Sequence, residues 1–297
     1  MSAHQLTIRK TILVTGGSAG IGFAVARSFA QASASKIILT GRRADVLASA
    51  VTALSKEFCN VSFRGYTCDV GKLEDTADLW NLLRTNGIYV DVLILNAARL
   101  GGTGDILTTG LQATWEAYER NVRSSLDFIK RFYTQDIDAD KQQVRPIPRP
   151  KVHNCNPGAP LIYFTNKYVV FVSSKAIHDI NAAAMAPSYT LSKIFGQVLM
   201  QAIAAGVDRK RMQIVSFHPG VILSETVRNG GYTEDSPVDW DSVDLPGQFA
   251  VWAATEQAAF LHGRFAWAAW DVDELRVQML RTEDEDNLFL TIGVRGI

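Results

Sequence analysis

The sequence has few cysteines, no surplus of charge and no long apolar run. Its three cysteines, Cys59, Cys68 and Cys155, include no C-x-x-C pair, which argues against a disulfide framework and fits a reducing compartment. The 30 basic and 30 acidic residues leave no net charge to attract nucleic acid or an anionic membrane. No stretch approaches the roughly 18 apolar residues of a membrane span, and an apolar signal core is missing. We therefore expect a cytoplasmic protein that binds neither nucleic acid nor membrane.

Metal ligands are also missing, because the five histidines are scattered without metal-ligand spacing. What the chain has instead is length and apolar content: 297 residues, 47% of them hydrophobic. That is enough to bury one large core. With no linker and no internal repeat, we expect a single domain over residues 1–297.

Strand-like apolar runs alternate with helical patterns along most of the chain. This alternation predicts βαβ units in an α/β fold, a Rossmann-type doubly wound parallel sheet with helices on both faces in three αβα layers. The ligand of such a fold lies at the C-terminal strand ends, near the switch in strand order. The expected strands are 11–15, 36–40, 61–66, 90–95, 168–173, 212–217 and 264–270.

A glycine-rich turn, Thr15-Gly16-Gly17-Ser18-Ala19-Gly20-Ile21-Gly22, follows the first strand and opens a helix. Gly16 allows the tight turn, Gly20 lets the backbone approach a ligand, and Gly22 lets the helix pack on the strand. Amides at this helix start can hold a pyrophosphate. The G-x-x-x-G-x-G spacing differs from the general G-x-G-x-x-G fingerprint, so a plain strand-to-helix turn is the alternative.

Tyr189 and Lys193 stand four residues apart, which places them on one helix face. An ammonium beside the phenol would lower the tyrosine pKa, and a depression of ~3 units corresponds to roughly 4 kcal/mol. Such a tyrosine exchanges a proton with a carbonyl oxygen, and the hydroxyl of Ser174 would hydrogen-bond the same oxygen. A purely structural role for the pair is the alternative.

Several motifs in order resemble the short-chain dehydrogenase/reductase family, from about residue 10 to 270, and the C-terminal part is similar to fungal members. The motifs are Thr15 to Gly22, Cys68-Asp69-Val70, Asn96-Ala97-Ala98, Glu119-Arg120-Asn121-Val122, Ser174, Tyr189-x-x-x-Lys193 and Pro219-Gly220. Two positions depart from the family. Arg99 replaces a usual glycine, and Ser174 precedes Tyr189 by 15 residues, against a usual gap of about a dozen.

The resemblance implies a catalytic tetrad of Asn121, Ser174, Tyr189 and Lys193, in which Lys193 also holds the nicotinamide ribose and Asn121 positions a water. It also implies a homodimer or homotetramer paired through helices near 112–133 and 188–206. The cofactor-binding residues implied are Gly16, Ser18, Gly20, Ile21, Gly22, Arg42, Arg43, Asp69, Asn96, Tyr189, Lys193, Pro219, Gly220, Ile222 and Ser224.

The second strand ends without an acidic residue, at Arg42 and Arg43. An acidic residue there would bind a ribose 2′-hydroxyl and repel a 2′-phosphate, whereas arginines can clamp that phosphate. Merely solvated arginines are the alternative. We therefore expect NADP(H) as the preferred cofactor, with NAD(H) possible.

Three segments stand apart from the regular pattern. Residues 134–161 are polar and proline-rich, which predicts a structureless surface insertion, with a functional flap, a partner-binding arm or a gene-model artefact as alternatives. Residues 223–246 contain Gly230-Gly231 and suit a mobile substrate lid. The C-terminal tail, 282–297, carries an apolar stretch that we expect to dock on the body.

Together these features predict an NADP(H)-dependent oxidoreductase that reduces a carbonyl, a ketone, to an alcohol or runs the reverse reaction. Tyr189 would be the acid and base, assisted by Lys193 and Ser174. The partner would be a small carbonyl or alcohol, with no metal. Two alternatives stay open: a binding module that senses the cofactor, and a non-redox isomerase or dehydratase on the same fold.

Overall fold

A single seven-stranded parallel sheet forms the centre of the molecule, with strand order β3-β2-β1-β4-β7-β8-β9. The computed structural model describes residues 10–101, 104–135, 137–138, 143–144, 167–178, 186–282 and 288–293. The strands are β1 (Thr11–Thr15), β2 (Lys36–Gly41), β3 (Ser62–Thr67), β4 (Val92–Leu95), β7 (Lys167–Val172), β8 (Met212–His218) and β9 (Phe265–Trp267). The predicted α/β class is confirmed, and each predicted strand is present with bounds shifted by at most a few residues.

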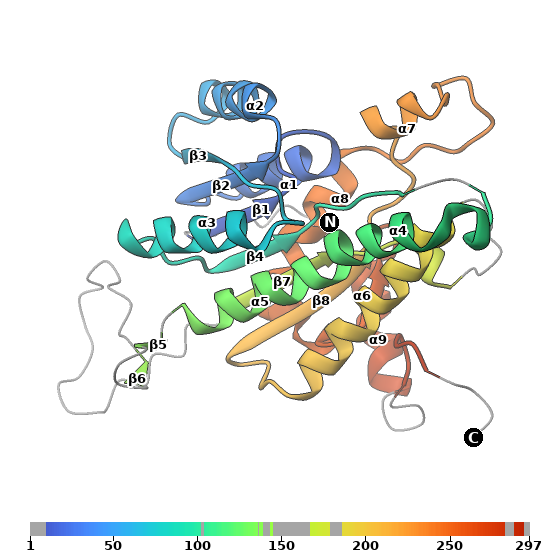
Figure 1. The fold of residues 1–297 in the computed structure, drawn as a ribbon. Coiled ribbons are helices and arrows are strands. Elements are labelled where there is room, and N and C mark those ends of the chain that lie inside the picture. Colours follow the sequence, from blue (N-terminus) through green and yellow to red (C-terminus); the bar gives the residue numbers. More distant parts are fainter. Residues whose placement is uncertain are drawn as a thin grey trace.

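Helices cover both faces of the sheet, with α5 and α6 in front of it in Figure 1. One apolar cluster joins the sheet to α1, α2, α8 and α9, and a second joins it to α3, α5 and α6. The helices are α1 (Gly20–Gln31), α2 (Ala44–Glu57), α3 (Leu73–Thr85), α4 (Ile106–Tyr118), α5 (Ser124–Thr134), α6 (Pro187–Ala205), α7 (Glu225–Asn229), α8 (Asp244–Ala253) and α9 (Val272–Thr282).

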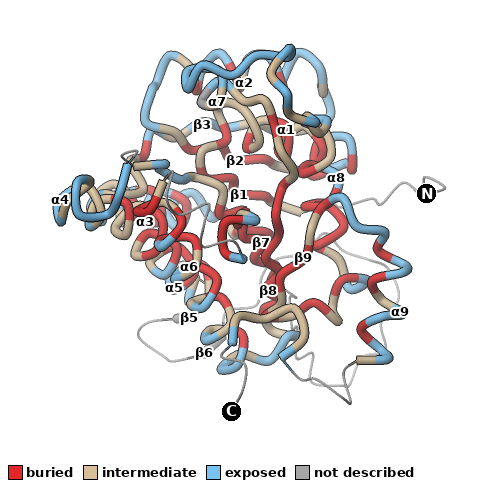
Figure 2. Tube along the Cα trace, turned by 90° about the vertical axis from the view of Figure 1, so that its right-hand side faces the viewer, coloured by how far each residue is buried: buried red, intermediate tan, exposed pale blue. Residues whose placement is uncertain are grey.

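The alternation of side chains along each strand explains why the sheet needs both layers. In β1, Ile12 and Val14 belong to one apolar cluster and Leu13 to the other, and all three are fully buried. The buried tube of the central strands in Figure 2 is flanked by helices whose outer turns are exposed. The core thus lies on both sides of β1, β4, β7 and β8.

The strand order reverses between β1 and β4, because β2 and β3 continue the sheet on one side and β7 on the other. Crossover helices leave these two strands in opposite directions, which opens a crevice at their C-terminal ends. The glycine turn follows β1 and Asn96 follows β4. Both motifs therefore reach the crevice by topology alone.

The helix expected near 112–133 is present, but it changes type along its length. Its first part, α4, has non-helical backbone angles at Gly110 (φ 75°) and ends at Tyr118. A π-helical turn, Glu119–Arg123, then leads into α5. Hydrophobic spacing does not reveal this π turn, because a single turn of five residues is too short to show a period of its own.

The insertion 134–161 lies largely outside the described residues. Within it, β5 (Ile137–Asp138) pairs antiparallel with β6 (Gln143–Val144), so this part is not structureless. All five prolines of the segment lie beyond residue 145, which leaves 137–144 able to pair. The insertion begins at the N-terminal edge of the sheet, where the Lys167 ammonium donates to the Tyr133 carbonyl at 2.9 Å.

The described part of the C-terminal tail, 288–293, contacts the body. Phe265 donates its amide to the Leu290 carbonyl at 2.9 Å, and Ile292 and Gln201 exchange two hydrogen bonds. None of the helices in the described ranges combines the length and the apolar character that a bilayer crossing requires.

Candidate active site

The glycine turn has the backbone shape that its sequence predicts. Gly16 and Gly20 have positive φ angles of 64° and 52°. A Cβ on Gly22 would lie 2.2 Å from the Gly16 carbonyl oxygen, so no other residue fits there. A Cβ on Gly20 would meet only Ser224, at 3.6 Å, which leaves open space before the first turn of α1. No side chain caps α1, so its first amides are available to an anion, and the turn fits a pyrophosphate.

Asn96 holds the turn in place. Its Nδ2 donates to the carbonyl oxygens of Thr15 (3.0 Å) and Gly16 (3.2 Å). The Thr15 hydroxyl donates to the Ile94 carbonyl at 3.1 Å and accepts the amides of Asn96 and Ala97. The side-chain amide of Asn96, predicted as a cofactor ligand, is therefore engaged with the backbone that forms the cradle.

The end of β2 brings Ser18, Arg42 and Arg43 to the same edge as the turn. The Ser18 hydroxyl lies 3.0 Å from the position that a Cβ on Gly41 would take, so glycine leaves room for it. Both arginines are exposed. Arg43 forms a long ion pair, 3.8 Å, with Glu225 at the start of α7. This corner therefore places two exposed arginines beside the glycine turn.

Asn121 is buried in the π-helical turn and links three segments of the site. Its Oδ1 accepts the Arg99 amide at 2.8 Å, and its Nδ2 donates to the Arg99 carbonyl (2.9 Å) and to the Ser192 hydroxyl (2.8 Å). Ser192 in turn donates to the Tyr189 carbonyl at 2.7 Å. Sequence reasoning missed Ser192, whose only signal is its place inside the Tyr189-x-x-x-Lys193 motif.

Tyr189 and Lys193 lie together on α6, as their spacing predicts. The Lys193 Nζ lies 5.6 Å from the centre of the Tyr189 ring and donates to the Val172 carbonyl at 2.6 Å. Burial lowers the pKa of Lys193 to about 8. Ser174, at the end of β7, hydrogen-bonds the phenol of Tyr189 and accepts the Ala176 amide at 3.2 Å. The structure thus brings three of the four predicted tetrad residues together, with Asn121 joined through Ser192.

The expected depression of the Tyr189 pKa is absent from this arrangement. Burial raises the pKa of Tyr189, and the hydrogen bond with Ser174 only partly opposes that effect. The ammonium of Lys193 is turned to the Val172 carbonyl, so it does not hydrogen-bond the phenol. The phenol therefore stays protonated at neutral pH.

The Pro219-Gly220 turn connects β8 to the segment 223–246. Gly220 has a φ of 95°, and a Cβ there would lie 2.7 Å from the Asp241 carboxylate. Asp241 accepts the Val221 amide at 2.8 Å and donates its own amide to the Val221 carbonyl, which fastens the far end of the segment to the turn. Ser224 caps α7 by accepting the Val227 amide, and Ile222 is buried.

The side of the sheet under α6 contains buried polar atoms without a hydrogen-bond partner in the described part of the chain. They belong to Ser173, Gln197, Ser216 and both ring nitrogens of His218. His218 packs edge-on against Trp267 at 4.7 Å. Burial, with a smaller effect from the cation of Lys175, lowers the pKa of His218 to about 4, so the ring is neutral at physiological pH.

Comparisons with known proteins agree with this geometry. The family model described as short chain dehydrogenase matches residues 10–143. Short chain dehydrogenase/reductase nsrO of Aspergillus novofumigatus is 30% identical over 285 residues, which covers 96% of this chain and 88% of that protein. Short chain dehydrogenase/reductase AacuD of Aspergillus aculeatus is 31% identical over 288 residues, again covering 96% and 88%.

Solved structures share the fold at lower identity. A short chain dehydrogenase from Shigella flexneri, complexed with NADP, superposes with a TM-score of 0.71 at 19% identity, over 89% of this chain and 98% of that one. L-Sorbose reductase from Gluconobacter frateurii, complexed with NADPH and L-sorbose, gives 0.68 at 19% identity over 89% and 96%. The motifs, the parallel sheet and the two fungal relatives together establish that this chain belongs to the short-chain dehydrogenase/reductase family of oxidoreductases.

Proposed function

We propose that this protein is an NADP(H)-dependent reductase that converts a ketone to an alcohol, or runs the reverse reaction. The observation that carries the proposal is the meeting of Tyr189, Ser174 and Lys193 on the same edge of the sheet as the glycine turn. A proton donor and a dinucleotide cradle on one edge suit a reaction that adds a hydride and a proton to one carbonyl group.

Each residue has a role that its surroundings support. Tyr189, kept protonated by burial, gives its proton to the carbonyl oxygen. The Ser174 hydroxyl donates a hydrogen bond to the same oxygen as negative charge develops there. Lys193, which is one helical turn away, restores the proton and binds the nicotinamide ribose, while Asn121 fixes the backbone around it. NADPH, when bound, supplies the hydride.

The cofactor contacts follow the edge of the sheet. Gly16, Gly20, Ile21 and Gly22 would surround the pyrophosphate, with Ser18 beside it. Arg42 and Arg43 would clamp the 2′-phosphate, because the end of β2 carries no acidic residue and both side chains are exposed. The nicotinamide end would be held by Pro219, Gly220, Ile222 and Ser224.

Assembly and location complete the proposal. An aromatic cluster on α4 and α6 consists of exposed Trp115 and Phe195 with half-buried Tyr118 between them. The ring centres of Trp115 and Tyr118 are 5.4 Å apart, and those of Tyr118 and Phe195 are 5.6 Å apart. We propose that this surface pairs two copies in a homodimer or homotetramer. The sparse, odd set of cysteines supports a cytoplasmic location.

A screen of ketones and aldehydes with NADPH and with NADH, followed by the absorbance of the reduced nicotinamide, tests the function. We expect turnover of a ketone, with NADPH in preference to NADH. Tight NADPH binding without turnover of any carbonyl would contradict the reductase and favour the cofactor-sensing module. Conversion of an alcohol or ketone without a change in the cofactor would favour an isomerase or dehydratase.

A further inference from the structure

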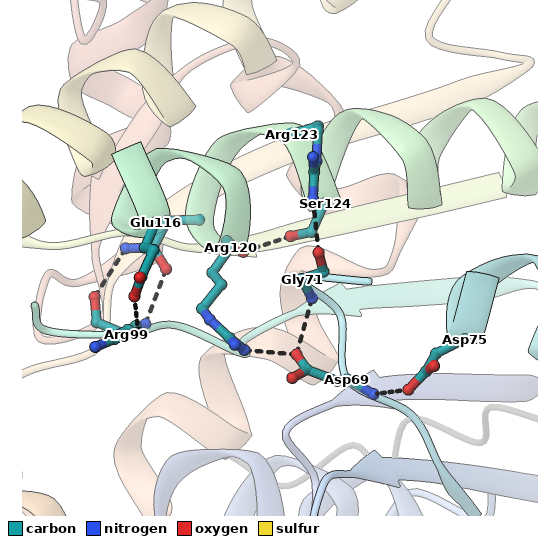
Figure 3. A network of polar contacts seen from close by, with 9 residues as sticks. Asp69, Gly71, Asp75, Arg99, Glu116, Arg120, Arg123 and Ser124 are labelled. Atoms are coloured by element: carbon teal, nitrogen blue, oxygen red, sulfur yellow. Dashed lines mark hydrogen bonds and ion pairs between the residues drawn. The ribbon is translucent and has the colours of Figure 1, made fainter. Parts of the chain in front are cut away.

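A half-buried ion pair crosses the end of the sheet beside β3. The Arg120 Nη1 lies 2.5 Å from the Asp69 Oδ1, and the two side chains are 24% and 16% exposed. The same Asp69 oxygen accepts the Gly71 amide at 3.0 Å, and the Asp69 amide donates to Asp75 at 2.8 Å (Figure 3). Asp69 is therefore fixed from two sides, and it fixes Arg120 in turn.

The pair lies where the adenosine half of a dinucleotide belongs. In a doubly wound fold that half crosses the C-terminal ends of the first three strands, starting from the glycine turn. Asp69 follows β3 directly, and Arg120 reaches the same place from the π-helical turn after α4. Arg42, at the end of β2, lies near enough to help lower the pKa of Asp69, after the hydrogen bonds from Gly71 and Arg120 that oppose its burial.

Gly71 determines how Arg120 presents its side chain. A Cβ at Gly71 would lie 3.0 Å from the Arg120 Cγ and 3.2 Å from its Cζ, so the arginine passes close to this glycine and a larger residue would displace it. One edge of the guanidinium is taken by Asp69. With its Nη1 held by Asp69 and its side chain close to Gly71, the guanidinium has a fixed place from which it can offer a planar face to a ligand.

The charges around Arg120 cancel. Arg99 pairs with Glu116, and Arg123 donates to the Gly71 carbonyl (Figure 3). Arg123 also pairs with Glu119. With the Arg120–Asp69 pair, this wall contains three arginines and three carboxylates. A balanced wall of guanidinium groups suits a flat, uncharged aromatic ring, whereas the exposed Arg42 and Arg43 suit a phosphate.

We propose that Arg120 is a cofactor-binding residue of this chain: held by Asp69 and Gly71, its guanidinium forms the wall on which the adenine ring of the cofactor stacks. The inference rests on the proposed function, because it needs a dinucleotide along this edge. Asp69 then acts on the adenine site mainly through Arg120, whose position it sets.

Binding measurements on two variants test the proposal. Arg120→Lys keeps the charge that pairs with Asp69 but removes the planar group, and Arg120→Met removes both. The dissociation constants of NADPH, of adenosine 2′,5′-bisphosphate and of reduced nicotinamide mononucleotide are measured by calorimetry. We expect each variant to bind the two adenine-containing ligands about 10-fold more weakly and the mononucleotide unchanged.

Arg131→Met is the matched control. Arg131 pairs with Asp127 at 3.0 Å on α5, with similar exposures of 31% and 16%, but lies about three turns further along toward the N-terminal edge. This variant should bind all three ligands as the wild type does. A loss of affinity in Arg131→Met equal to that in Arg120→Lys would overturn the proposal.

Other outcomes are equally decisive. Unchanged NADPH affinity in a folded Arg120→Lys protein would mean that the Arg120–Asp69 pair only stabilises the fold. Tighter NADPH binding would mean that Arg120 hinders the cofactor. Either result overturns the inference. An equal loss for the mononucleotide would also overturn it, since that ligand has no adenine. Wild-type protein that binds neither NADPH nor NADH would overturn the proposed function itself.

Discussion

The two halves of the sheet's C-terminal edge are built differently. Around β1 and β4, the groups that shape the glycine turn have their partners within the fold, as Asn96 and Thr15 show. Around β7 and β8, buried polar atoms of Ser173 and His218 have no hydrogen-bond partner among the described residues. Burial also lowers the pKa values of Lys193 and His218, which both belong to this half.

The difference separates two ways of making a site. The cofactor half depends on backbone shape, which short polar side chains and glycines fix before any ligand arrives. The catalytic half depends on ionisable side chains in a dry environment, where a lost partner or a changed charge has a large effect. Substitutions in the catalytic half should therefore change turnover, and substitutions in the cofactor half should change the preference between cofactors.

The largest effect is expected in the catalytic half, from Lys193→Met. This change keeps the volume of the side chain but removes the buried ammonium, so turnover should fall on the order of 100-fold or more, with weaker NADPH binding. Lys167→Met is the control, because its buried ammonium also donates to a carbonyl, at the opposite end of β7. Equal losses of turnover in both variants would mean that Lys193 has no special role.

His218 tests whether the catalytic half is sensitive to acid. Its folded-state pKa of about 4 lies below the ordinary 6.5, so the unfolded chain binds the proton more tightly. Stability contributed by neutral His218 is present above pH 6.5 and is lost as the pH falls toward 4, by about 3 kcal/mol in total. In urea titrations the His218→Leu variant should lack this loss. Parallel pH profiles of the two proteins would show that His218 does not titrate in this way.

The choice between NADPH and NADH tests the cofactor half of the comparison. Replacing Arg42 and Arg43 by alanine should weaken NADPH binding roughly 10- to 100-fold and NADH binding much less, because only NADPH carries the 2′-phosphate. Arg228→Ala serves as a control, since Arg228 is exposed and pairs with Glu234 within the segment 223–246. Equal losses for NADPH and NADH would remove the basis for NADP preference.

The smallest effect on turnover is expected from a substitution on the outer face of α6. Phe195 is 50% exposed on the face opposite Lys193 and contacts Tyr118. Phe195→Glu should convert a dimer or tetramer into monomers, as measured by light scattering at micromolar concentration, with only a modest loss of turnover. Leu280→Glu, a change at an exposed apolar residue of α9, should leave the assembly intact. A wild-type monomer would contradict the proposal.

The sequence predicts the local parts of this molecule well. The glycine turn, the strands and the Tyr189–Lys193 helix depend on residues close together in the chain, where spacing and side-chain type determine structure. The charged wall is different. Asp69 and Arg120 are 51 positions apart, and nothing in either neighbourhood predicts that they meet.

The direction of the Tyr189 pKa shift is a second feature that the sequence does not predict. Helical spacing places Lys193 beside the phenol, but it does not say where the ammonium points. The nearby Val172 carbonyl accepts its hydrogen bond, and burial then decides the pKa of the phenol. Residues 179–185, which lie between Ser174 and Tyr189, are outside the described ranges, as is most of the insertion 134–161.

Tyr189→Phe gives the most direct test of the central claim, that this phenol is the proton donor. The change removes one hydroxyl, so folding and NADPH affinity should match the wild type while single-turnover hydride transfer to a ketone falls about 100- to 10,000-fold. Tyr168→Phe removes another buried phenol, one that bonds Glu256 in the other layer of the core, and should leave hydride transfer unchanged. Near-wild-type hydride transfer in Tyr189→Phe would contradict the account.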